Sequence, residues 1–382
     1  MAHSYVQSAQ EAAGLVDDLA RAKRIALDCE AAGFHRYSDR LCLVQLTTER
    51  ATYLIDPLAF DASAVLRPPL EDPDLTVVMH GADFDLRLLS RDLRIRLHGL
   101  FDTQIAAQLL GEETLGLAGL LESRFGMRLS KKFQRADWAE RPLSDGMLEY
   151  AADDTRHLMR LADWLTAELA EARRLGWAKE ECRALEAAAG ELPKDEEPED
   201  PILRIKGARH LSARQITALR EALAWRDEIA RARDRALFRV IAEGPLIDAV
   251  AAQPRTVSDL VAIKGFPQRL AEEEGAGLIQ RLDRVTLMKD DELRGYPRPP
   301  RRGGFRSTPE MEALAEKLKD ARNRKADELR LPRGTLLSNS TLMEIARAAP
   351  RSVDALAQVE GVRRWKAEAL GEDFVKLIRG GG

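Results

Sequence analysis

Hydrophobic positions follow two different patterns along this chain, and the pattern changes near residue 190. In the first 170 residues, short apolar runs rich in β-branched residues alternate with stretches of helical period. Three runs in close succession favour an antiparallel meander, and the later alternation of strand and helix favours parallel additions to the same sheet. The pattern therefore predicts an α/β domain with a mixed sheet flanked by helices. The four expected strands are RIALDCE (24–30), LCLVQLTT (41–48), TYLIDP (52–57) and TVVMHG (76–81).

Helical periods fill the chain after these strands. DFDLRLLSRDL (83–93) and TQIAAQLLG (103–111) repeat apolar residues at helical spacing. A longer period runs from Ser144 to about Arg174 and predicts one long helix. Helices at these places would cover the faces of the sheet.

The second half of the chain is helical in pattern and repeats itself. PLIDAVAAQPRTVSDLVAIKGF (245–266) aligns with TLMEIARAAPRSVDALAQVEGV (341–362) at a constant offset of 96 residues. Leucines, a Pro–Arg pair and a glycine recur at matching positions, so each copy predicts the same small helical bundle. Trp225 and Trp365 are expected in the cores of these bundles.

Two segments between these regions have nothing to bury. ELPKDEEPEDP (191–201) holds three prolines and six acids, and RGYPRPPRRGGFR (294–306) is basic and rich in Gly and Pro. Both predict extended linkers. The expected order is an α/β domain (1–190), an acidic linker (191–207), a first bundle (208–288), a basic linker (289–305) and a second bundle (306–382).

Composition adds constraints on location. An apolar content of 45% and a charged content of 32% are typical of a globular protein, and no apolar run approaches the length that crosses a membrane. The N-terminus lacks the basic and apolar regions of a signal peptide, and Cys29, Cys42 and Cys182 form no disulfide framework. We therefore expect a cytoplasmic protein with no membrane contact.

The charge is divided between the two halves. Residues 201–382 carry 35 Lys and Arg against 26 Asp and Glu, a net charge of +9, whereas residues 1–200 carry a net charge of −13. Such a division is expected where one half holds metal ions and the other binds a polyanion. The alternative is that charge differs between domains without any functional meaning.

Acidic residues stand at the ends of two expected strands. Asp28 and Glu30 are two apart in an extended run, so they project to the same side and repel each other unless a cation lies between them. After TVVMHG, Asp83 suits the N-cap of the next helix, and Asp85 in the first turn is free to point elsewhere. Each feature alone also fits an ordinary solvated strand end or helix start.

A further carboxylate stands on the long helix expected from Ser144. Tyr150 and Asp154 in EYAADDTRHL are four residues apart and share one face of that helix. Asp153 lies near the same face, but the spacing of four favours Asp154. The alternative is a polar pair on an ordinary surface helix.

Taken together, LDCE, HGADFDL and YAADD resemble the three motifs of the DEDD superfamily of 3′→5′ exonucleases, in its tyrosine-containing branch. The phrases LCLVQL, LIDP, FDTQ (101–104) and ADWAERPL (136–143) fit the same pattern. The two bundles resemble helicase-and-RNase-D C-terminal (HRDC) domains, and the whole chain resembles the ribonuclease D family. The resemblance implies a ribonuclease-H-like α/β exonuclease domain followed by two all-α HRDC domains. Cys29, where many relatives have threonine, and Ala31, where bulkier residues are frequent, depart from the pattern.

The resemblance implies phosphodiester hydrolysis with two divalent ions, Mg²⁺ or Mn²⁺, which oxygen ligands select. It assigns Asp28, Glu30 and Asp154 to the ion that activates water. Asp28 also reaches the second ion, and Asp85 supports that second ion. Tyr150 would touch the attacking water. A phenol with a pKa of about 10 is almost entirely neutral at pH 7, so Tyr150 is expected to orient the water rather than act as an ionised base.

We therefore expect a 3′→5′ exoribonuclease that releases 5′-mononucleotides and trims the 3′ ends of tRNA precursors and other structured RNAs. Arg231, Arg233, Arg235 and Arg239 would contact the RNA backbone without reading its sequence. A monomer is expected. Two alternatives stay open at this point: a DNA 3′→5′ exonuclease, and a nucleic-acid-binding protein whose nuclease domain is inactive.

Overall fold

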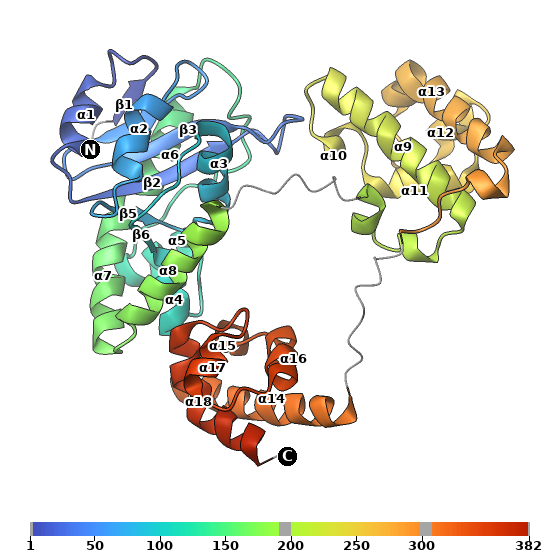
Figure 1. The fold of residues 1–382 in the computed structure, drawn as a ribbon. Coiled ribbons are helices and arrows are strands. Elements are labelled where there is room, and N and C mark those ends of the chain that lie inside the picture. The colour runs from blue at the N-terminus through green and yellow to red at the C-terminus, as the bar shows by residue number, and fades with distance from the viewer. Residues whose placement is uncertain (1–2, 191–199, 298–307, 381–382) are drawn as a thin grey trace.

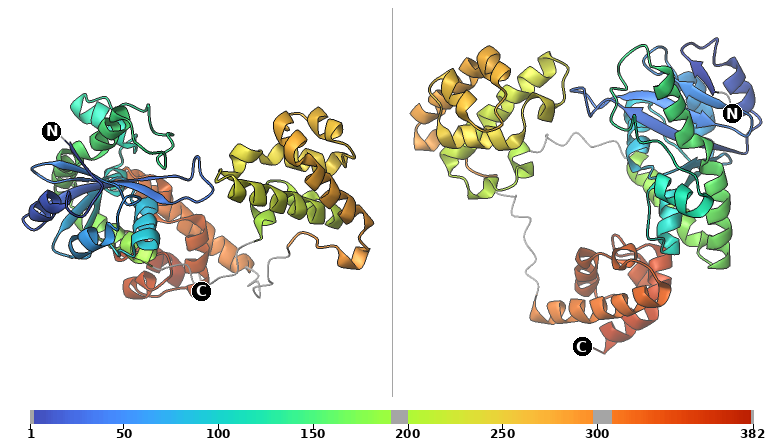
Figure 2. Two further views of the ribbon diagram at one scale, coloured as in Figure 1. Left: turned by 90° about the horizontal axis from the view of Figure 1, so that it is seen from above. Right: turned by 180° about the vertical axis from the view of Figure 1, so that it is seen from behind.

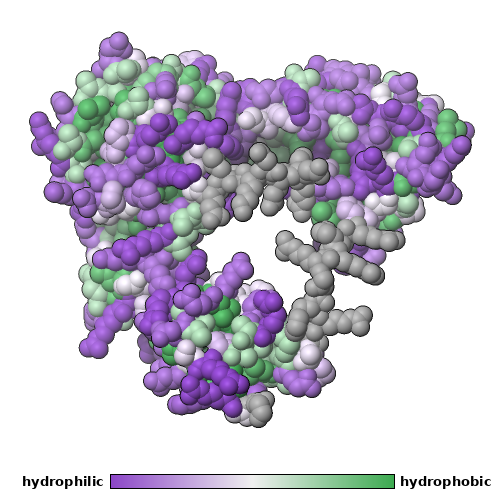
Figure 3. All heavy atoms as spheres, in the orientation of Figure 1, coloured by the Kyte–Doolittle hydropathy of each residue, from purple (hydrophilic) through white to green (hydrophobic). Residues whose placement is uncertain are grey.

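The computed structural model of the chain describes residues 3–190, 200–297 and 308–380. Most of the expected acidic linker and the second half of the expected basic linker lie outside the described residues. The α/β domain and the two helical bundles can be told apart in the ribbon view, with the second bundle against the end of the α/β domain that carries α4 and α8 (Figure 1). The face seen in Figure 3 is largely hydrophilic, with apolar side chains in small separate patches.

A six-stranded mixed sheet forms the centre of the α/β domain, with strand order β1-β4-β3-β2-β5-β6. β2, β3 and β4 are antiparallel, whereas β5 and β6 add in parallel beside β2, which confirms the expected mixed sheet. β1 pairs in parallel with β4 and was not expected, because its four residues HSYV show too little apolar alternation. The strands are β1 (His3–Val6), β2 (Arg24–Ala31), β3 (Leu41–Thr47), β4 (Thr52–Ile55), β5 (Thr76–Met79) and β6 (Leu100–Asp102).

Helices cover both faces of this sheet. One face packs against α1, α2, α3 and α8, and the other packs against α6 and α7. The single long helix expected from Ser144 is wrong, because α6 lies on β3 and β4 whereas α7 starts after His157 and turns toward α4 and β5. The helices are α1 (Ala13–Leu19), α2 (Ser63–Leu70), α3 (Asp83–Leu93), α4 (Thr103–Leu110), α5 (Leu117–Phe125), α6 (Asp145–Arg156), α7 (Leu158–Glu171) and α8 (Leu175–Gly190).

The two bundles have the same helix order, and the offset of 96 residues holds in detail. Arg226 and Arg322 are both buried and donate to the backbone carbonyls of Ile241 and Leu337 respectively. The first bundle contains α9 (Ala213–Ala232), α10 (Leu237–Val240), α11 (Glu243–Ala252), α12 (Val257–Ala262) and α13 (Gln268–Leu287). The second contains α14 (Pro309–Leu329), α15 (Arg333–Leu336), α16 (Asn339–Ala348), α17 (Val353–Ala357) and α18 (Arg364–Arg379).

The first bundle is longer than the sequence pattern indicated. Ile202 and Ile205 are buried in its core, and the Asp200 carboxylate pairs with Arg220 at 2.6 Å. Arg220 also donates to the carbonyl of Arg294. The segments 200–207 and 289–297 therefore pack on this bundle, and the expected linker boundaries at 207 and 289 are wrong. The few apolar residues in these segments stand among prolines and charged residues, so they show no helical or strand period.

The second bundle packs directly on the α/β domain. The indole rings of Trp177 in α8 and Trp365 in α18 are stacked, with centroids 4.5 Å apart. Both carboxylate oxygens of Glu180 accept N–H groups at the start of α18, from Arg364 and Trp365. Residues of α4, α7 and α8 form one continuous apolar cluster with α14, α16 and α18. The views from above and behind show the same packing (Figure 2).

None of the helices within the described ranges has both the length and the apolar character needed to cross a membrane.

Candidate metal centre

Strand β2 changes character at Asp28. Ile25 and Leu27 face α1–α3, whereas Ala26 points to the face covered by α6 and α7. Asp28 and Glu30 continue the second series, so both carboxylates lie on the α6 side of the sheet. Cys29 packs toward the opposite face, as expected for a residue that points away from the two acids.

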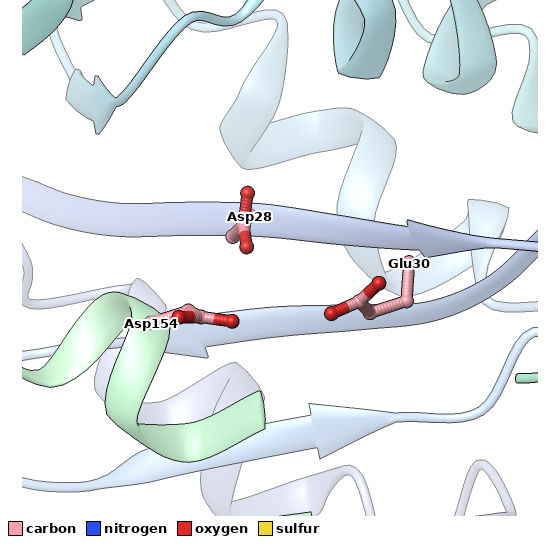
Figure 4. Close-up of side chains that lie close together, drawn as sticks. All are labelled: Asp28, Glu30 and Asp154. Atoms are coloured by element: carbon pink, nitrogen blue, oxygen red, sulfur yellow. The ribbon is translucent and has the colours of Figure 1, made fainter. Parts of the chain in front are cut away.

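Helix α6 brings a third carboxylate to this place. Residues Met147, Ala151 and Ala152 bury one side of α6 against the sheet. This packing leaves Asp154 beside β2, and ligand oxygens of Asp28, Glu30 and Asp154 all lie within 4.8 Å of one another. Figure 4 shows the Glu30 and Asp154 carboxylates pointing toward one another, with Asp28 beside them.

Asp85 comes from the first turn of α3 and is buried, with 8% of its surface exposed. It is not part of the tight group of three, but the charge of Asp28 contributes to raising its pKa. The structure thus brings all four expected acids to one end of the sheet. We call Asp28, Glu30, Asp85 and Asp154 the acidic centre.

Asp83 does not cap α3, which corrects the sequence-based expectation. The N-cap position is Ala82, and Asp83 pairs instead with Arg87 one turn later, at 2.6 Å. The turn before α3 is held by Asp102, whose carboxylate accepts the N–H groups of Gly81 at 3.0 Å and Ala82 at 2.8 Å. Asp102 also caps α4, which gives the FDTQ phrase a structural role.

The part of the chain that the structure describes supplies no cationic side chain to the acidic centre. Within residues 3–190, 200–297 and 308–380, no Lys or Arg side chain forms an ion pair with any of its four acids. Burial raises the pKa of Asp28 to about 7, and burial together with the charge of Asp28 raises the pKa of Asp154 to about 8. Burial and neighbouring carboxylates also hold the pKa values of Glu30 and Asp85 well above their usual range.

Such an arrangement is costly unless a cation compensates the charge. Four convergent carboxylates with no positive partner among the described residues fit one or more hard divalent cations, for which oxygen donors are the preferred ligands. The residues present therefore fit Mg²⁺ or Mn²⁺.

Tyr150 lies one turn before Asp154, and its ring packs between Phe133 and Trp138, with both ring centroids 6.1 Å away. Burial, followed by the charges of Asp154 and Glu30, raises the pKa of Tyr150 above its usual value of 10. The phenol therefore stays neutral at physiological pH and can donate a hydrogen bond. This agrees with an orienting role and argues against an ionised base.

A partly buried ion pair fixes the loop that supports Tyr150. The guanidinium of Arg141 makes two hydrogen bonds to the Asp56 carboxylate, at 2.6 and 2.8 Å, and a third to the carbonyl of Cys42. Tyr5 donates to the same carboxylate at 2.6 Å. The phrases LIDP and ADWAERPL thus meet in space, because Asp56 belongs to the first and Arg141 to the second.

Sequence reasoning missed Gln45. It lies directly across from Asp28 in the β2–β3 register and is fully buried on the same side of the sheet. Its side-chain amide makes no hydrogen bond to any residue that the structure describes. A polar residue inside the apolar run LCLVQLT is the signal that could have marked it.

The contact between the first bundle and the loop 32–40 was also missed. Tyr37 in this loop donates to Asp227 at 2.9 Å, and Arg231 donates to the Tyr37 hydroxyl at 2.9 Å. Arg239 donates to the carbonyl of Phe34. The contacts join residues about 190 positions apart, so no local pattern could indicate them.

The arginines around α10 also have partners within the protein. Arg231 and Arg239 hold the loop 32–40, and Arg233 pairs with Glu273 and Glu274 at 3.0 and 2.7 Å. Three of the four arginines thus have partners within the protein, and their contact with the RNA backbone stays a prediction. Arg235 is exposed. Trp225 and Trp365 are buried, as expected.

Comparisons with known proteins agree with this architecture. A family model described as a 3′-5′ exonuclease matches residues 4–170, and the HRDC domain model matches residues 215–282 and 311–378. Ribonuclease D from Shewanella sp. is 30% identical over 290 residues, which cover 76% of this chain and 74% of that protein. Ribonuclease D from Pseudomonas paraeruginosa is 29% identical over 357 residues, covering 93% and 92% respectively.

A solved structure matches over the whole length. The crystal structure of RNase D from Escherichia coli, described as an exoribonuclease involved in structured RNA processing, has a TM-score of 0.68 and 25% identity. The match covers 100% of this chain and 99% of that one. Exonucleases of the DEDD superfamily use divalent metal ions, which the acidic centre fits. The chain belongs to the ribonuclease D family and is a hydrolytic 3′→5′ exoribonuclease.

Proposed function

We propose that this exoribonuclease trims the 3′ ends of structured RNAs, tRNA precursors above all, and releases 5′-mononucleotides. Asp28, Glu30, Asp85 and Asp154 are assigned to two Mg²⁺ or Mn²⁺ ions, and Tyr150 to the attacking water. The observation that carries this assignment is the convergence of buried carboxylates without a described cationic partner. The structured-RNA role of the matching Escherichia coli protein supports the choice of substrate. We further propose that the protein acts as a cytoplasmic monomer.

When bound, divalent ions would lower the pKa of water and neutralise charge on the phosphate. The protein's own residues do the rest. The strand and helix backbones fix the positions of Asp28, Glu30 and Asp154, so little reorganisation is needed when ions and substrate arrive. The neutral hydroxyl of Tyr150 can donate to an oxygen at the reacting phosphate or orient the water that attacks it. Phe133 and Trp138 keep the phenol ring in place.

A direct test combines purified protein with 3′-end sequencing. A tRNA precursor with a 3′ trailer should be shortened from its 3′ end in Mg²⁺, with 5′-mononucleotides as the product, and EDTA should abolish the reaction. In cells that lack the protein, tRNA precursors with 3′ extensions should accumulate. Unchanged 3′ ends in those cells would reject the tRNA assignment and leave another RNA as the substrate.

A matched DNA oligonucleotide tests selectivity for RNA. RNA and DNA of the same sequence should be compared at equal concentration, and the protein should release nucleotides faster from the RNA. Faster release from the DNA would contradict the proposal. Failure to release nucleotides from any RNA, despite tight binding, would instead indicate an inactive nuclease domain.

A further inference from the structure

A cleft of about 600 Å³ opens beside the acidic centre, between the α/β domain and the first bundle. Its walls come from three parts of the chain: the end of β2 with the loop that follows it, the start of α3, and the start of α10. Glu30 lines one end of the cleft and also belongs to the acidic centre. The apolar side chains that line the cleft include Phe34, Phe84, Leu237 and Phe238.

The cleft gathers exposed aromatic rings. Phe34, Phe84 and Phe238 are 38%, 48% and 52% exposed, and they are the three exposed phenylalanines of the described residues. Leu237, also exposed, adjoins them. Exposed apolar side chains that are scattered singly need no explanation, but a group on one cleft marks a binding surface. In the ribbon, the blue loop after β2 reaches toward α10 (Figure 1), and residues of both line the cleft.

Hydrogen bonds hold the two walls in fixed positions. The backbone N–H of Ala236 donates to the carbonyl of His35 at 3.0 Å, and Arg239 donates to the carbonyl of Phe34 at 2.7 Å. The ring centroids of Phe34 and Phe238 lie 5.5 Å apart and the ring planes are inclined at 55°, so the rings are in contact but are not stacked face to face. The guanidinium of Arg239 lies 4.7 Å from the Phe34 ring. About half of the Phe238 surface stays open although its neighbours are held rigidly.

We infer that this cleft is a subsite for unpaired nucleobases near the 3′ end of the RNA, and that the first bundle supplies one of its walls through Phe238. The inference rests on the proposed function, because the cleft is continuous with the acidic centre through Glu30. A strand whose terminal phosphodiester reaches that centre must run its neighbouring nucleotides along an adjoining surface. Aromatic faces bind every base, so they suit an enzyme that shortens RNA without reading its sequence.

The chemistry of the cleft favours this occupant over a protein segment. Stacking on an aromatic ring contributes to the binding of each base, and arginine beside the rings adds a cation for the negatively charged strand. The guanidinium of Arg239, 4.7 Å from the Phe34 ring, supplies such a cation. Single-stranded RNA has planar bases, which can stack on the rings, and an anionic backbone, which the arginine can attract.

The test compares intact and base-free substrates in the full-length protein. The rate of the first cut is measured on RNAs that are labelled at the 3′ nucleotide. In a series of these RNAs, a single abasic site stands at each of the last positions in turn. In the unchanged protein, KM should rise about tenfold when the abasic site enters the cleft, with kcat nearly unchanged. Phe238→Leu should give the same rise in KM on intact RNA and should no longer respond to the abasic site.

Leu287→Ala is the matched control, because Leu287 is an exposed apolar residue of the same bundle, at 85% exposure, and does not line the cleft. It should leave KM and its abasic response unchanged. Phe34→Leu, on the opposite wall, should behave like Phe238→Leu and guards against a folding defect in one variant. If Phe238→Leu raises KM equally on intact and abasic RNA, Phe238 only joins the domains and the inference is wrong.

An unchanged KM in both leucine variants would also overturn it, while metal-dependent release of nucleotides would still support the proposed function. The two claims therefore fail in different ways.

Discussion

Trp365 of the second bundle lies stacked on Trp177 of the exonuclease domain, with ring centroids 4.5 Å apart and ring planes at 18°. A chain that ends near Gly190 would lose this contact. All five assigned site residues lie within such a fragment. The fragment lacks residues 308–380, however, so the apolar surfaces of α4, α7 and α8 that pack on the second bundle would be exposed.

Trp365→Ala should lower the free energy of unfolding by about 3 kcal/mol, because it removes a large buried ring from the joint between two domains. Urea or thermal unfolding of the full chain measures this. Arg269 is the control, since it occupies the equivalent position in the first bundle and its side chain is 87% exposed. Arg269→Ala should change stability little. Equal effects of the two changes would show that the joint does not contribute to stability.

Truncation after Gly190 should lower the temperature of unfolding and promote aggregation, since the second bundle no longer covers its apolar partner surface. Light scattering and thermal unfolding of the fragment and the full chain are the measurements. A fragment as stable and soluble as the full chain would contradict this prediction and would show that the catalytic domain does not need the second bundle for stability.

Asp28→Asn should reduce the rate of RNA hydrolysis to below about a tenth of the unchanged value, because the shared ligand loses its charge. RNA binding should survive. Asp83→Asn is the matched control, since Asp83 stands two residues before Asp85 but pairs with Arg87 and is not part of the acidic centre. It should leave the rate nearly unchanged. Rates are read from the release of a labelled 3′ nucleotide, and a rate above a tenth for Asp28→Asn would reject the ligand assignment.

Without metal ions, stability should fall as pH rises from about 5 to about 8, because the folded protein holds protons on acids that the unfolded chain has released. The pKa values of Asp28 and Asp154 are about 7 and about 8 in the folded protein, against about 4 in the unfolded chain. The stabilising protonated form is thus complete at low pH and is lost as pH rises through the folded pKa values.

Thermal unfolding in EDTA across this pH range checks the slope. Asp28→Asn should make it shallower, and Mg²⁺ should raise the unfolding temperature more at pH 8 than at pH 6, because ionised acids bind the ion. A slope of the opposite sign that Asp28→Asn leaves unaltered would contradict the prediction.

Asp56→Asn should lower the free energy of unfolding by about 3 kcal/mol, because it leaves the partly buried Arg141 without its charged partner. The side chain of Asp56 is 1% exposed and that of Arg141 is 25% exposed. The exposed pair Arg128–Glu122 is the control, at 85% and 54% exposure, and Glu122→Gln should cost less than about 1 kcal/mol. Chemical unfolding of the two variants compares these costs.

Alternation and repetition were enough to predict much of this molecule. The series Ala26, Asp28 and Glu30 follows from strand periodicity, and the helical spacing of four places Tyr150 and Asp154 on one face. The repeat at 96 residues predicted two bundles of the same order. These features are local or are copies of one another, so a single sequence carries them.

What the sequence did not reveal depends on packing between distant segments. Asp102 caps the turn before α3 from a neighbouring strand, which leaves Asp83 no capping role. Helix α7 diverges from α6 because each packs on different elements. Tyr37 meets Asp227 across two domains. None of these partners lies within one helical turn or one strand of the residue it contacts.

The repeat of 96 residues has a consequence for how the two bundles attach to the exonuclease domain. Helices α10 and α15 occupy equivalent positions, and both bundles turn this short helix toward the exonuclease domain: Ala236 bonds to His35, and Thr335 accepts from Gln108 of α4 at 3.1 Å. The same edge of the repeated fold therefore attaches both bundles to the exonuclease domain. The side chains on that edge differ, since Phe238 in one copy corresponds to Gly334 in the other. One backbone arrangement thus serves as an open aromatic wall in the first bundle and as a closed joint in the second.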